Sequence, residues 1–289
     1  MTTRKNTWTV LDILNVTSEY FKNNNFENPR LNAERLLSHV LDIDRVNLYL
    51  QFERLLTNDE KHLYRSLVKR RSENEPLQYI IGQTEFMGLP FNVNQHVLIP
   101  RPETELLVET VLDLKKGLMQ DKVNIWDIGT GSGCIGISLA HLWPDSRVIA
   151  TDNSDSALEI AKTNAQLNEA ENISFKKHDI LLEIPANERD IHIVVSNPPY
   201  ISQIESESLA KEIADYEPIS ALTDFKDGLE FYRRILTLID KVNGCKFVII
   251  EMSGTQTDNI LSLVKSYNYS NTEIINDLNQ IPRILKISV

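Results

Sequence analysis

Short apolar segments alternate with helical patterns in the second part of the chain, and this order restricts the fold more than any other feature. The segments expected as strands are 123–128, 147–151, 173–177, 191–196, 246–251 and 284–289. Helices are expected to begin near Glu103, Cys134, Asp155, Leu229 and Thr257. Segments such as 193–195 are apolar without alternation, which is typical of strands covered by helices on both faces. The order predicts an open α/β sheet that binds ligands at the carboxyl ends of its strands.

The N-terminal part of the chain has the period of helices instead. Apolar residues recur on one face and predict a helix at about 29–42, with Asn28 as N-cap and Pro29 as the first helical residue. Thr57 and Glu60 have the spacing of a capping box at the start of a later helix. The apolar face of that later helix comprises Leu63, Tyr64, Leu67 and Val68. These patterns predict a small helical bundle.

Between the two patterns, glycines and a proline interrupt short apolar segments. Gly82, Gly88 and Pro90 are the interrupting residues, and they predict a hairpin. A chain of 289 residues is about twice the usual length of a domain, which agrees with two domains. We therefore expect a helical domain at 1–80, a hairpin linker at 81–101 and an α/β domain at 102–289.

The charge balance bears on the kind of partner. The chain has 30 basic and 41 acidic residues, a formal net charge of −11, and the excess of acidic residues lies after residue 100. Affinity for nucleic acid depends largely on Lys and Arg displacing counterions from phosphates, so no direct nucleic-acid target is expected. The basic run Lys69-Arg70-Arg71 is interpreted as the last turn of a helix, where cations face the negative end of the dipole.

Other features bear on location and on metals. No apolar run approaches the roughly 20 residues that cross a membrane, and the N-terminus lacks the apolar core of a signal peptide. Cys134 and Cys245 form no CxxC pair, so no disulfide is expected. The histidines, among them His141, His178 and His192, have no metal-ligand spacing and are interpreted as surface or edge residues. We expect a cytoplasmic protein with no membrane partner and no metal.

A glycine-rich loop follows the first expected strand of the α/β part. It runs from Asp127 to Gly133, and its candidate cofactor-binding residues are Gly129, Thr130, Gly131, Ser132 and Gly133. The next strand ends at Asp152, whose carboxylate can accept hydrogen bonds from a ribose diol. The alternative role of Asp152 is a helix N-cap, which Ser154 could fill equally well. The loop predicts an adenosine cofactor and leaves nicotinamide and S-adenosylmethionine open, because its glycines also fit GxGxxG.

A second motif, Asn197-Pro198-Pro199-Tyr200, directly follows the expected strand 191–196. The prolines stiffen the turn and remove backbone donors, so carbonyl oxygens are exposed. The Asn and Pro carbonyls are acceptors suited to a planar –NH₂ group, and the Tyr ring offers a face on which a planar group can lie. The motif therefore predicts catalysis on an amide or amidine nitrogen.

The two motifs together resemble those of S-adenosylmethionine enzymes that methylate amino groups, both adenine or cytosine methylases and protein-glutamine methylases. A narrower resemblance is to the release-factor glutamine methyltransferases, the PrmC/HemK family. It rests on Leu77-Gln78-Tyr79-Ile80, Gly82, Glu85-Phe86, Gly88-Leu89 and the run from Val97 to Glu105. The likeness covers nearly the full chain. It implies a Rossmann-like S-adenosylmethionine-dependent methyltransferase fold with a small N-terminal helical bundle. Because that bundle is helical and lacks a glycine loop, we expect it to recognise the protein substrate rather than the cofactor.

The resemblance also implies a reaction and a set of site residues. The reaction is methylation of the side-chain amide nitrogen (N5) of the glutamine in the GGQ motif of peptide-chain release factors. Catalytic residues would be Asn197, Pro198, Pro199 and Tyr200. The implied S-adenosyl-L-methionine contacts are Asn197, the glycine loop, Asp152 on the ribose, and Ile180 beside the adenine. Ile180 stands where an aromatic residue is familiar in the family, so an aliphatic contact replaces a stack. Arg101 and Thr104 are placed near the methionine end, although Arg101 could instead pair with Glu103 or Glu105.

Two other functions remain open at this point. An adenine-N6 nucleic-acid methyltransferase would use the same turn on a flipped base, and it needs a basic recognition region. A nicotinamide oxidoreductase or a silent adenosine-binding module could be built on the same sheet. In the favoured reaction an amide nitrogen is a poor nucleophile, and the sequence shows no acid-base pair at the turn. Geometry and electrostatics are therefore expected to drive catalysis.

Overall fold

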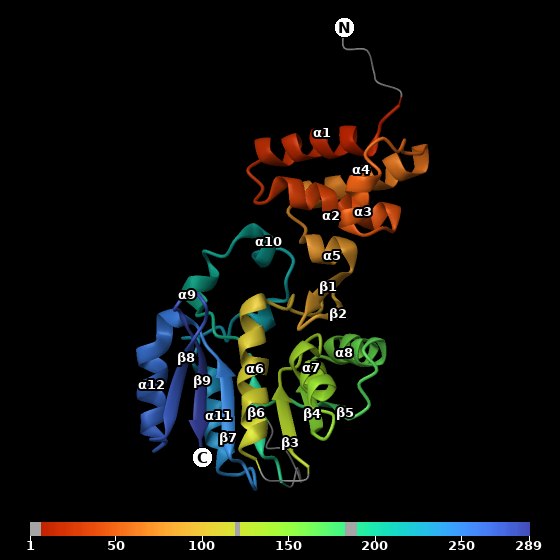
Figure 1. Cartoon of the computed structure of the whole chain (residues 1–289). Coiled ribbons are helices and arrows are strands. Elements are labelled where there is room, and N and C mark those ends of the chain that lie inside the picture. The colour runs from red at the N-terminus through yellow and green to blue at the C-terminus, as the bar shows by residue number, and fades with distance from the viewer. Residues whose placement is uncertain (1–6, 119–121, 183–189) are drawn as a thin grey trace. The chain divides into compact units, whose positions relative to one another are not determined.

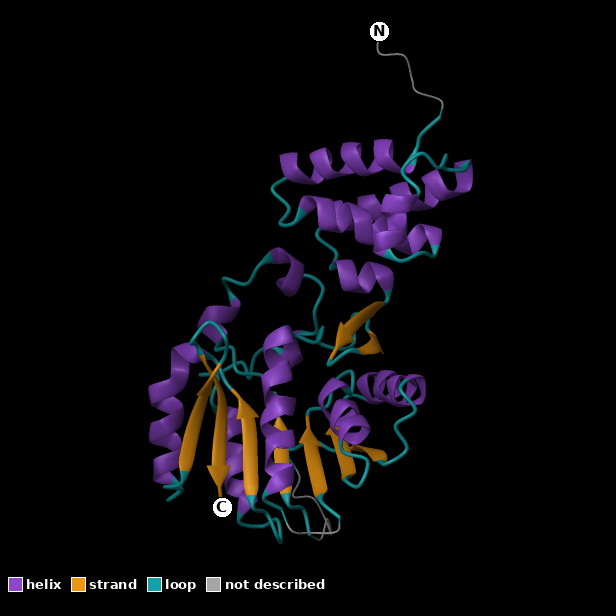
Figure 2. Cartoon of the chain, viewed as in Figure 1, coloured by secondary structure: helices purple, strands orange, loops and turns teal. Residues whose placement is uncertain are grey.

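The computed structural model of the chain describes residues 7–118, 122–182 and 190–289 (Figure 1). The chain divides into two compact units, Met1–Gly82 and Gln83–Val289. The first contains helices, and the second contains all the strands that the structure describes, as the colours of Figure 2 show. No helix in the described ranges is both long and apolar enough to span a membrane.

The first unit is a bundle of short helices. They are α1 (Val10–Asn23), α2 (Pro29–Leu41), α3 (Arg45–Leu50), α4 (Asn58–Ser72) and α5 (Leu77–Ile81). Its core contains the large side chains of Leu14, Phe21, Leu36, Leu37 and Tyr64, all fully or almost fully buried. The reciprocal hydrogen bonds of Thr57 and Glu60 confirm the capping box at the start of α4. The basic run lies in the last turn of α4 as expected.

Two details of this unit differ from the sequence-based expectations. Asn28 occupies the position before α2, but it is left-handed (φ 48°) and its side chain makes no capping hydrogen bond to the described residues. The proline at the first position fixes the start of the helix without that cap. Leu63 was expected on the buried face of α4 and is 47% exposed, because the face that packs on the bundle is centred on Tyr64 and Leu67.

One sheet organises the second unit. Its seven described strands are β3 (Asn124–Ile128), β4 (Arg147–Asp152), β5 (Ile173–Lys177), β6 (Ile193–Ser196), β7 (Phe247–Glu251), β8 (Thr272–Asn276) and β9 (Pro282–Ser288). The strand order is β5-β4-β3-β6-β7-β9-β8. Neighbours from β5 to β7 are parallel, and β9 runs antiparallel to β7 and β8. This confirms the expected α/β sheet and adds β8, which the sequence analysis missed.

Helices cover both faces of the sheet. Helices α6 (Glu105–Asp113) and α7 (Cys134–Leu142) share one hydrophobic core with one set of strand side chains. Helices α11 (Glu230–Ile239) and α12 (Thr257–Ser266) share the other core with the alternate set. Helix α8 (Asp155–Leu167) contacts β4 and β5. The central strands β6 and β7 are buried on both faces and are apolar except at their last residue.

The expected hairpin is formed by β1 (Gln83–Phe86) and β2 (Leu89–Asn92), which pair antiparallel. Phe86 and Phe91 enter the core beside α6 and α7. Asn164 of α8 donates to the Asn92 carbonyl and accepts from the Asn92 amide, at 3.0 and 2.7 Å. These contacts attach the hairpin to the sheet unit.

The segment between β6 and α11 is longer than a simple crossover and was not predicted in detail. It contains two short helices, α9 (Gln203–Ser206) and α10 (Lys211–Ala214), and a 3-10 turn at Ile219–Ala221. An isolated bridge joins Ile201 to Thr223 where the segment returns to the sheet. The segment therefore lies at the carboxyl edge, where the candidate site is found.

Candidate active site

A pocket of about 240 Å³ lies at the carboxyl ends of β3, β4 and β6. Seven of the predicted site residues line it: Gly129, Gly131, Asp152, Ile180, Asn197, Pro198 and Pro199. The remaining four, Thr130, Ser132, Gly133 and Tyr200, are not among its lining residues. The structure thus brings the glycine loop and the proline turn to one cavity.

The glycine loop owes its shape to backbone conformation and to one buried carboxylate. Gly129 and Gly131 have φ values of 71° and 55°, which favour glycine, and an added Cβ at either would meet nothing within 4 Å. Asp127 accepts hydrogen bonds from the Thr130 hydroxyl at 2.6 Å and from the Gly136 amide at 3.0 Å. Thr130 therefore turns away from the pocket and stabilises the loop from behind.

The side chain of Asp127 is completely buried. Burial raises the pKa of its carboxyl to about 7, against the lowering effect of its two hydrogen bonds. A side chain at position 136 would be crowded, because an added Cβ would lie 2.8 Å from the Asp127 carboxylate. Sequence analysis placed Asp127 only at the start of the loop and missed its role as the support of the loop.

Asp152 faces the pocket and also holds the loop. Its two oxygens accept hydrogen bonds from the backbone amides of Gly131 and Ser154, each at 2.9 Å. Ser154 is the N-cap of α8, since its hydroxyl accepts from the Ala157 amide at 3.2 Å. The alternative role of Asp152 as that cap is therefore wrong. Burial raises the pKa of the Asp152 carboxyl above its usual value.

The pocket lining also includes the apolar Ile180 and the polar His178. Ile180 is buried, and its carbonyl accepts a hydrogen bond from Arg234 of α11. His178, which was expected at the surface or an edge, lines the pocket, and His96 does so as well. Among the described residues no group of three His, Cys, Asp or Glu side chains could hold a metal ion.

Both ends of the proline turn are held by side chains from other elements. The side-chain amide nitrogen (Nδ2) of Asn197 donates a hydrogen bond to the hydroxyl of the buried Thr104 at 3.2 Å. The Tyr200 hydroxyl donates to Glu251 Oε1 at 3.4 Å, and burial raises the pKa of Tyr200. Thr104 is the nearby residue that the sequence analysis named, whereas Glu251 was missed. The sequence did contain a feature that could have indicated Glu251, because it is an acidic residue at the end of the apolar strand β7, at the carboxyl edge of the sheet.

Arg101 pairs with neither of the acids considered for it. Its guanidinium contacts the buried carboxylate of Glu217 at 2.6 Å, and Glu217 also accepts from the Ile99 amide at 3.4 Å. The partner lies 116 residues away in the segment between β6 and α11, so sequence proximity was no guide to it. The ion pair connects the segment before α6 to Glu217, which directly precedes Pro218. Pro218 lines the pocket.

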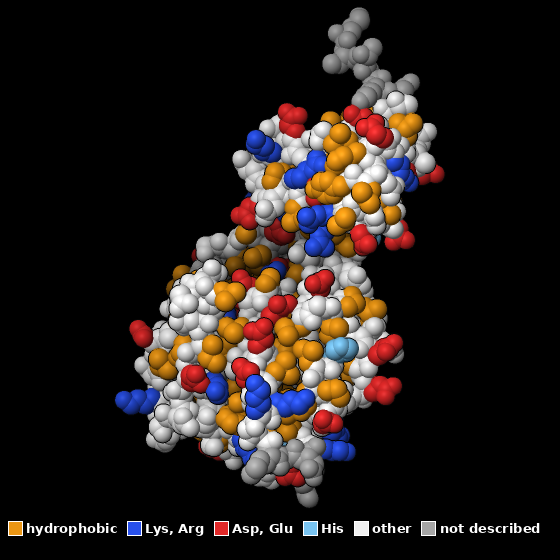
Figure 3. Space-filling view, viewed as in Figure 1, with side chains coloured by type: hydrophobic (Ala, Val, Ile, Leu, Met, Phe, Trp, Pro, Cys, Tyr) orange, Lys and Arg blue, Asp and Glu red, His pale blue; other side chains and the backbone are white. Residues whose placement is uncertain are grey.

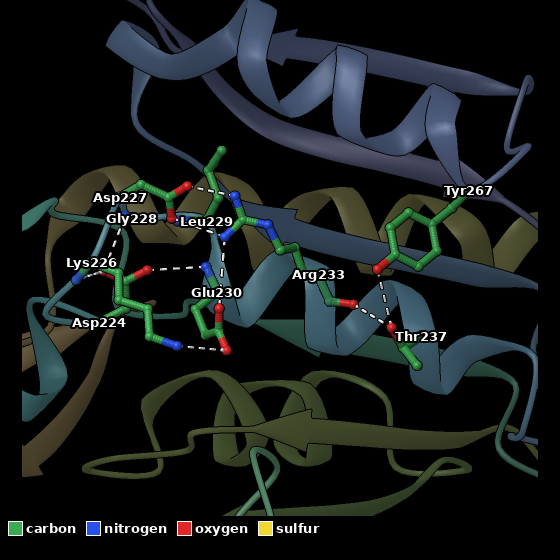
Figure 4. Close-up of polar contacts among 9 residues, drawn as sticks. All are labelled: Asp224, Lys226, Asp227, Gly228, Leu229, Glu230, Arg233, Thr237 and Tyr267. Atoms are coloured by element: carbon green, nitrogen blue, oxygen red, sulfur yellow. Dashed lines mark hydrogen bonds and ion pairs between the residues drawn. The ribbon is translucent and has the colours of Figure 1, made fainter.

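The loop before α11 also supports the proline turn. Asp224 accepts hydrogen bonds from the amides of Lys226, Gly228 and Glu230, as the dashed lines in Figure 4 show. An ion pair between Asp227 and Arg233 fixes the same loop. Gly228 (φ 81°) is packed against the turn, because an added Cβ would lie 2.5 Å from the Tyr200 carbonyl oxygen.

Replacing Gly228 with alanine is therefore expected to displace Tyr200. We expect turnover to fall roughly 10–10²-fold, since small misplacements of a positioning group have effects of that size. Gly244→Ala is the matched control, because Gly244 has the same φ of 81° but its Cβ would approach no atom closer than 3.5 Å. Both variants carry backbone strain, so equal turnover in the two would contradict a specific effect on Tyr200. The measurement is steady-state turnover beside thermal unfolding.

Solved structures with the same fold were found over most of the chain. The human Mettl16 catalytic domain, solved in complex with MAT2A 3'UTR hairpin 6, has a TM-score of 0.58 and 17% identity, covering 81% of this chain and 84% of that one. The human methyltransferase 10 domain containing protein has a TM-score of 0.53 and 19% identity, covering 70% and 88%. The fold is that of a Rossmann-like S-adenosylmethionine-dependent methyltransferase.

Sequence relatives define the family. Residues 12–82 match the PrmC N-terminal domain, and residues 102–216 match the methyltransferase small domain. The release factor glutamine methyltransferase of Geobacter sulfurreducens is 36% identical over 99% of this chain and 98% of its own length. That of Leptospira interrogans is 39% identical over 93% and 94%. The chain belongs to the release factor glutamine methyltransferase family.

Proposed function

We propose that the chain methylates the side-chain amide nitrogen (N5) of the glutamine in the GGQ motif of peptide-chain release factors, with S-adenosylmethionine as methyl donor. The observation that carries the proposal is that Asn197 and Pro198 line the same pocket as Gly129, Gly131 and Asp152. Acceptors suited to an amide –NH₂ group thus stand beside a loop suited to an adenosine. Since release factors act in translation, the proposed place of the reaction is the cytoplasm.

The pocket residues suit S-adenosylmethionine. The Asp152 carboxylate retains lone pairs that would accept the ribose hydroxyls, and the buried Ile180 offers an apolar surface to the adenine. The open space beside Gly129 and Gly131 allows close approach of the loop backbone. When bound, this cofactor supplies an electrophilic methyl group on a sulfonium.

The proline turn would do the remaining chemistry by positioning. The lone pair of an amide nitrogen is delocalised into its carbonyl, so the nitrogen attacks poorly unless it is held in line with the methyl group. The carbonyl oxygens of Asn197 and Pro198 would accept hydrogen bonds from its two N–H groups. They would also stabilise the positive charge that develops on the nitrogen during attack. Tyr200 would lie along the plane of the amide. The proton can leave to water once the nitrogen carries that charge.

The direct test is mass spectrometry of a release factor incubated with the enzyme and S-adenosylmethionine. We expect a mass increase of one methyl substitution on the GGQ glutamine. A release factor with glutamate at that position should remain unmodified, which identifies the acceptor. An unmodified wild-type factor would contradict the proposal.

We also propose that the first unit recognises the release factor. Its helices carry no glycine loop, whereas the complete pocket is formed by residues after Gly82. Removing residues 1–82 is expected to leave cofactor affinity nearly intact and to abolish methylation of an intact release factor. Calorimetry and single-turnover methylation would measure the two effects. Loss of cofactor binding in a truncated chain that is folded by circular dichroism would contradict this role.

The adenine-N6 alternative is not favoured. The Mettl16 neighbour was solved with an RNA hairpin, but at 17% identity the likeness concerns the fold. On the face of residues 83–289 drawn in Figure 3, acidic, basic and hydrophobic side chains are interspersed. The net charge of −11 also disfavours binding to a phosphate backbone. Incubation with RNA and DNA oligonucleotides and labelled S-adenosylmethionine is expected to give no incorporation.

A further inference from the structure

The carbonyl oxygen at the end of the proline turn is bound by a side chain that follows β7. Gln256 is the last residue of the 3-10 helix Gly254–Gln256, and only 9% of it is exposed. Its side-chain nitrogen Nε2 donates to the Tyr200 carbonyl oxygen at 3.3 Å and to Glu205 Oε2 of α9 at 3.4 Å. Gln256 thus connects the last residue of the turn to α9.

Hydrogen-bond capacities fix the orientation of the Gln256 amide. The backbone amide and the hydroxyl of Ser202 both donate to Glu205, at 3.0 and 2.7 Å, and these contacts lower the pKa of its carboxyl. An ionised carboxylate only accepts hydrogen bonds, and so does the Tyr200 carbonyl oxygen. The two N–H groups of Gln256 therefore serve one acceptor each. A reversed amide would place its own oxygen against both acceptors.

Gly228 leaves room for the contact between Gln256 and Tyr200. An added Cβ at Gly228 would lie 2.7 Å from Gln256 Nε2 and 2.5 Å from the Tyr200 carbonyl oxygen. The amide and the carbonyl therefore meet beside a position that has no side chain. The Tyr200 carbonyl is closely packed by the loop before α11 as well as hydrogen-bonded by Gln256.

We propose that Gln256 is a positioning residue that fixes the end of the proline turn through the Tyr200 carbonyl. The proposal rests on the proposed function, because it takes the turn as the element that holds the substrate amide. Gln256 and Tyr200 are not among the residues that line the pocket, whereas Pro198 and Pro199 are. Gln256 therefore acts through the backbone of the turn. The fixed φ angles of the prolines leave that backbone few ways to absorb a displacement of its last carbonyl.

Two substitutions of Gln256 test the proposal by their order. Gln256→Glu keeps the shape of the side chain but places an acceptor against the Tyr200 carbonyl and a negative charge against Glu205. Gln256→Met keeps a similar length and removes the donor without adding a charge. We expect turnover on a release factor to fall roughly 10–10²-fold in Gln256→Glu. In Gln256→Met it should fall roughly 2–10-fold, the effect of one net hydrogen bond.

Cofactor affinity should stay nearly unchanged in both variants, because Gln256 is not among the residues that line the pocket. If only the shape of the side chain mattered, Gln256→Glu would be the milder substitution. That order, or wild-type turnover in Gln256→Met, would overturn the proposal.

Exchanging the two side chains separates positioning from support of the fold. In the double variant Gln256→Glu with Glu205→Gln, a donor at position 205 again faces an acceptor at position 256. Glutamine can also complete the capping box that Glu205 forms with Ser202 at the start of α9. The Tyr200 carbonyl, however, still faces an acceptor. We expect thermal stability to return close to that of the wild type while turnover stays low, and recovery of both together would overturn the proposal.

Gln203→Glu is the matched control for Gln256→Glu. Gln203 is an exposed residue of α9, two positions before Glu205, so the same chemical change adds the same charge close to the turn. Turnover and cofactor affinity should both remain at the wild-type level. A loss of turnover equal to that of Gln256→Glu would mean that charge alone causes the effect, and it would overturn the proposal.

The Tyr200 carbonyl gives a readout that needs no release factor. Protein labelled with ¹³C in tyrosine carbonyls and ¹⁵N in isoleucine gives amide-to-carbonyl signals only from the pairs Tyr79-Ile80 and Tyr200-Ile201. The Tyr200 signal is identified by its loss in Tyr200→Phe. It should shift in Gln256→Met, whereas the signal of Tyr79 in α5 should not.

This readout distinguishes failure of the proposal from failure of the proposed function. A Tyr200 signal that does not move in Gln256→Met would overturn the role of Gln256, whether or not the release factor is methylated. Failure of the proposed function would appear instead as an unmethylated release factor with the wild-type enzyme.

Discussion

Turnover is expected to fall roughly 10²–10³-fold when Asn197 is replaced by alanine, while affinity for S-adenosylmethionine stays nearly the same. In the proposed reaction, the substitution would remove an acceptor whose interaction strengthens as positive charge develops on the substrate nitrogen. An interaction made mainly in the transition state affects the rate constant more than ground-state binding. Single-turnover methylation of a release factor and calorimetric cofactor affinity measure the two effects separately.

Further substitutions in the turn sharpen that expectation. Asn197→Asp keeps an acceptor but adds a negative charge beside the sulfonium, so it should bind the cofactor more tightly without restoring the rate. Tyr200→Phe keeps the ring and loses only the 3.4 Å hydrogen bond to Glu251, so it should be milder than Tyr200→Ala. Near-normal turnover in Asn197→Ala would mean that the amide is held elsewhere, and the assignment of the turn would be wrong.

Much of the α/β unit could be predicted because its local signals agree with its tertiary environment. Each expected strand forms within a residue or two of its predicted bounds. The central strands β6 and β7, which are buried on both faces, are apolar except at their last residue. Strand β8, an edge strand that pairs only with β9, was missed because none of its residues is buried and only Ile274 and Ile275 are apolar. Its antiparallel neighbour β9 was found as a strand, but sequence pattern does not give strand direction.

The helical unit shows the limit of reading caps from residue type. Thr57 and Glu60 form the predicted capping box, whereas Asn28 stands at the predicted place and does not cap. The two cases differ in backbone conformation, because Thr57 is extended (ψ 168°) and Asn28 is left-handed (ψ 52°). A side chain reaches back to the first amides of a helix only from the extended conformation. Sequence alone does not specify which conformation the preceding loop imposes.

The position of the pocket followed from the sequence, but the contacts within it did not. The glycine loop, Asp152 and the proline turn each follow a strand, and the carboxyl ends of parallel strands share one edge of a sheet. The supporting contacts join residues far apart in the chain. Asn197 and Thr104 are 93 residues apart, and Tyr200 and Glu251 are 51 apart. Such pairs are set by the packed fold, and only the placement of Glu251 at a strand end hinted at one of them.

The second large effect is expected at Asp152. Asp152→Ala should weaken S-adenosylmethionine binding by one to several powers of ten, because the two charge-assisted hydrogen bonds proposed to the ribose would be lost, at roughly 1.5–3 kcal/mol each. The substitution also removes the acceptor of the Gly131 amide, so the glycine loop loses a restraint that orders it before the cofactor binds. Calorimetry of the full-length protein measures the dissociation constant.

Asp155→Ala is the matched control for Asp152→Ala. Asp155 is an exposed carboxylate three residues further along the chain, where it pairs with Lys177, and it does not line the pocket. Its loss should leave cofactor affinity nearly unchanged, which excludes a general effect of negative charge on the sulfonium. Since burial raises the pKa of Asp152, affinity of the wild-type protein should fall on acidification at a higher pH than an ordinary aspartate would titrate. The Asp152→Ala protein should lack that decline in affinity at low pH. A dissociation constant that is unchanged by Asp152→Ala would show that Asp152 does not bind the ribose.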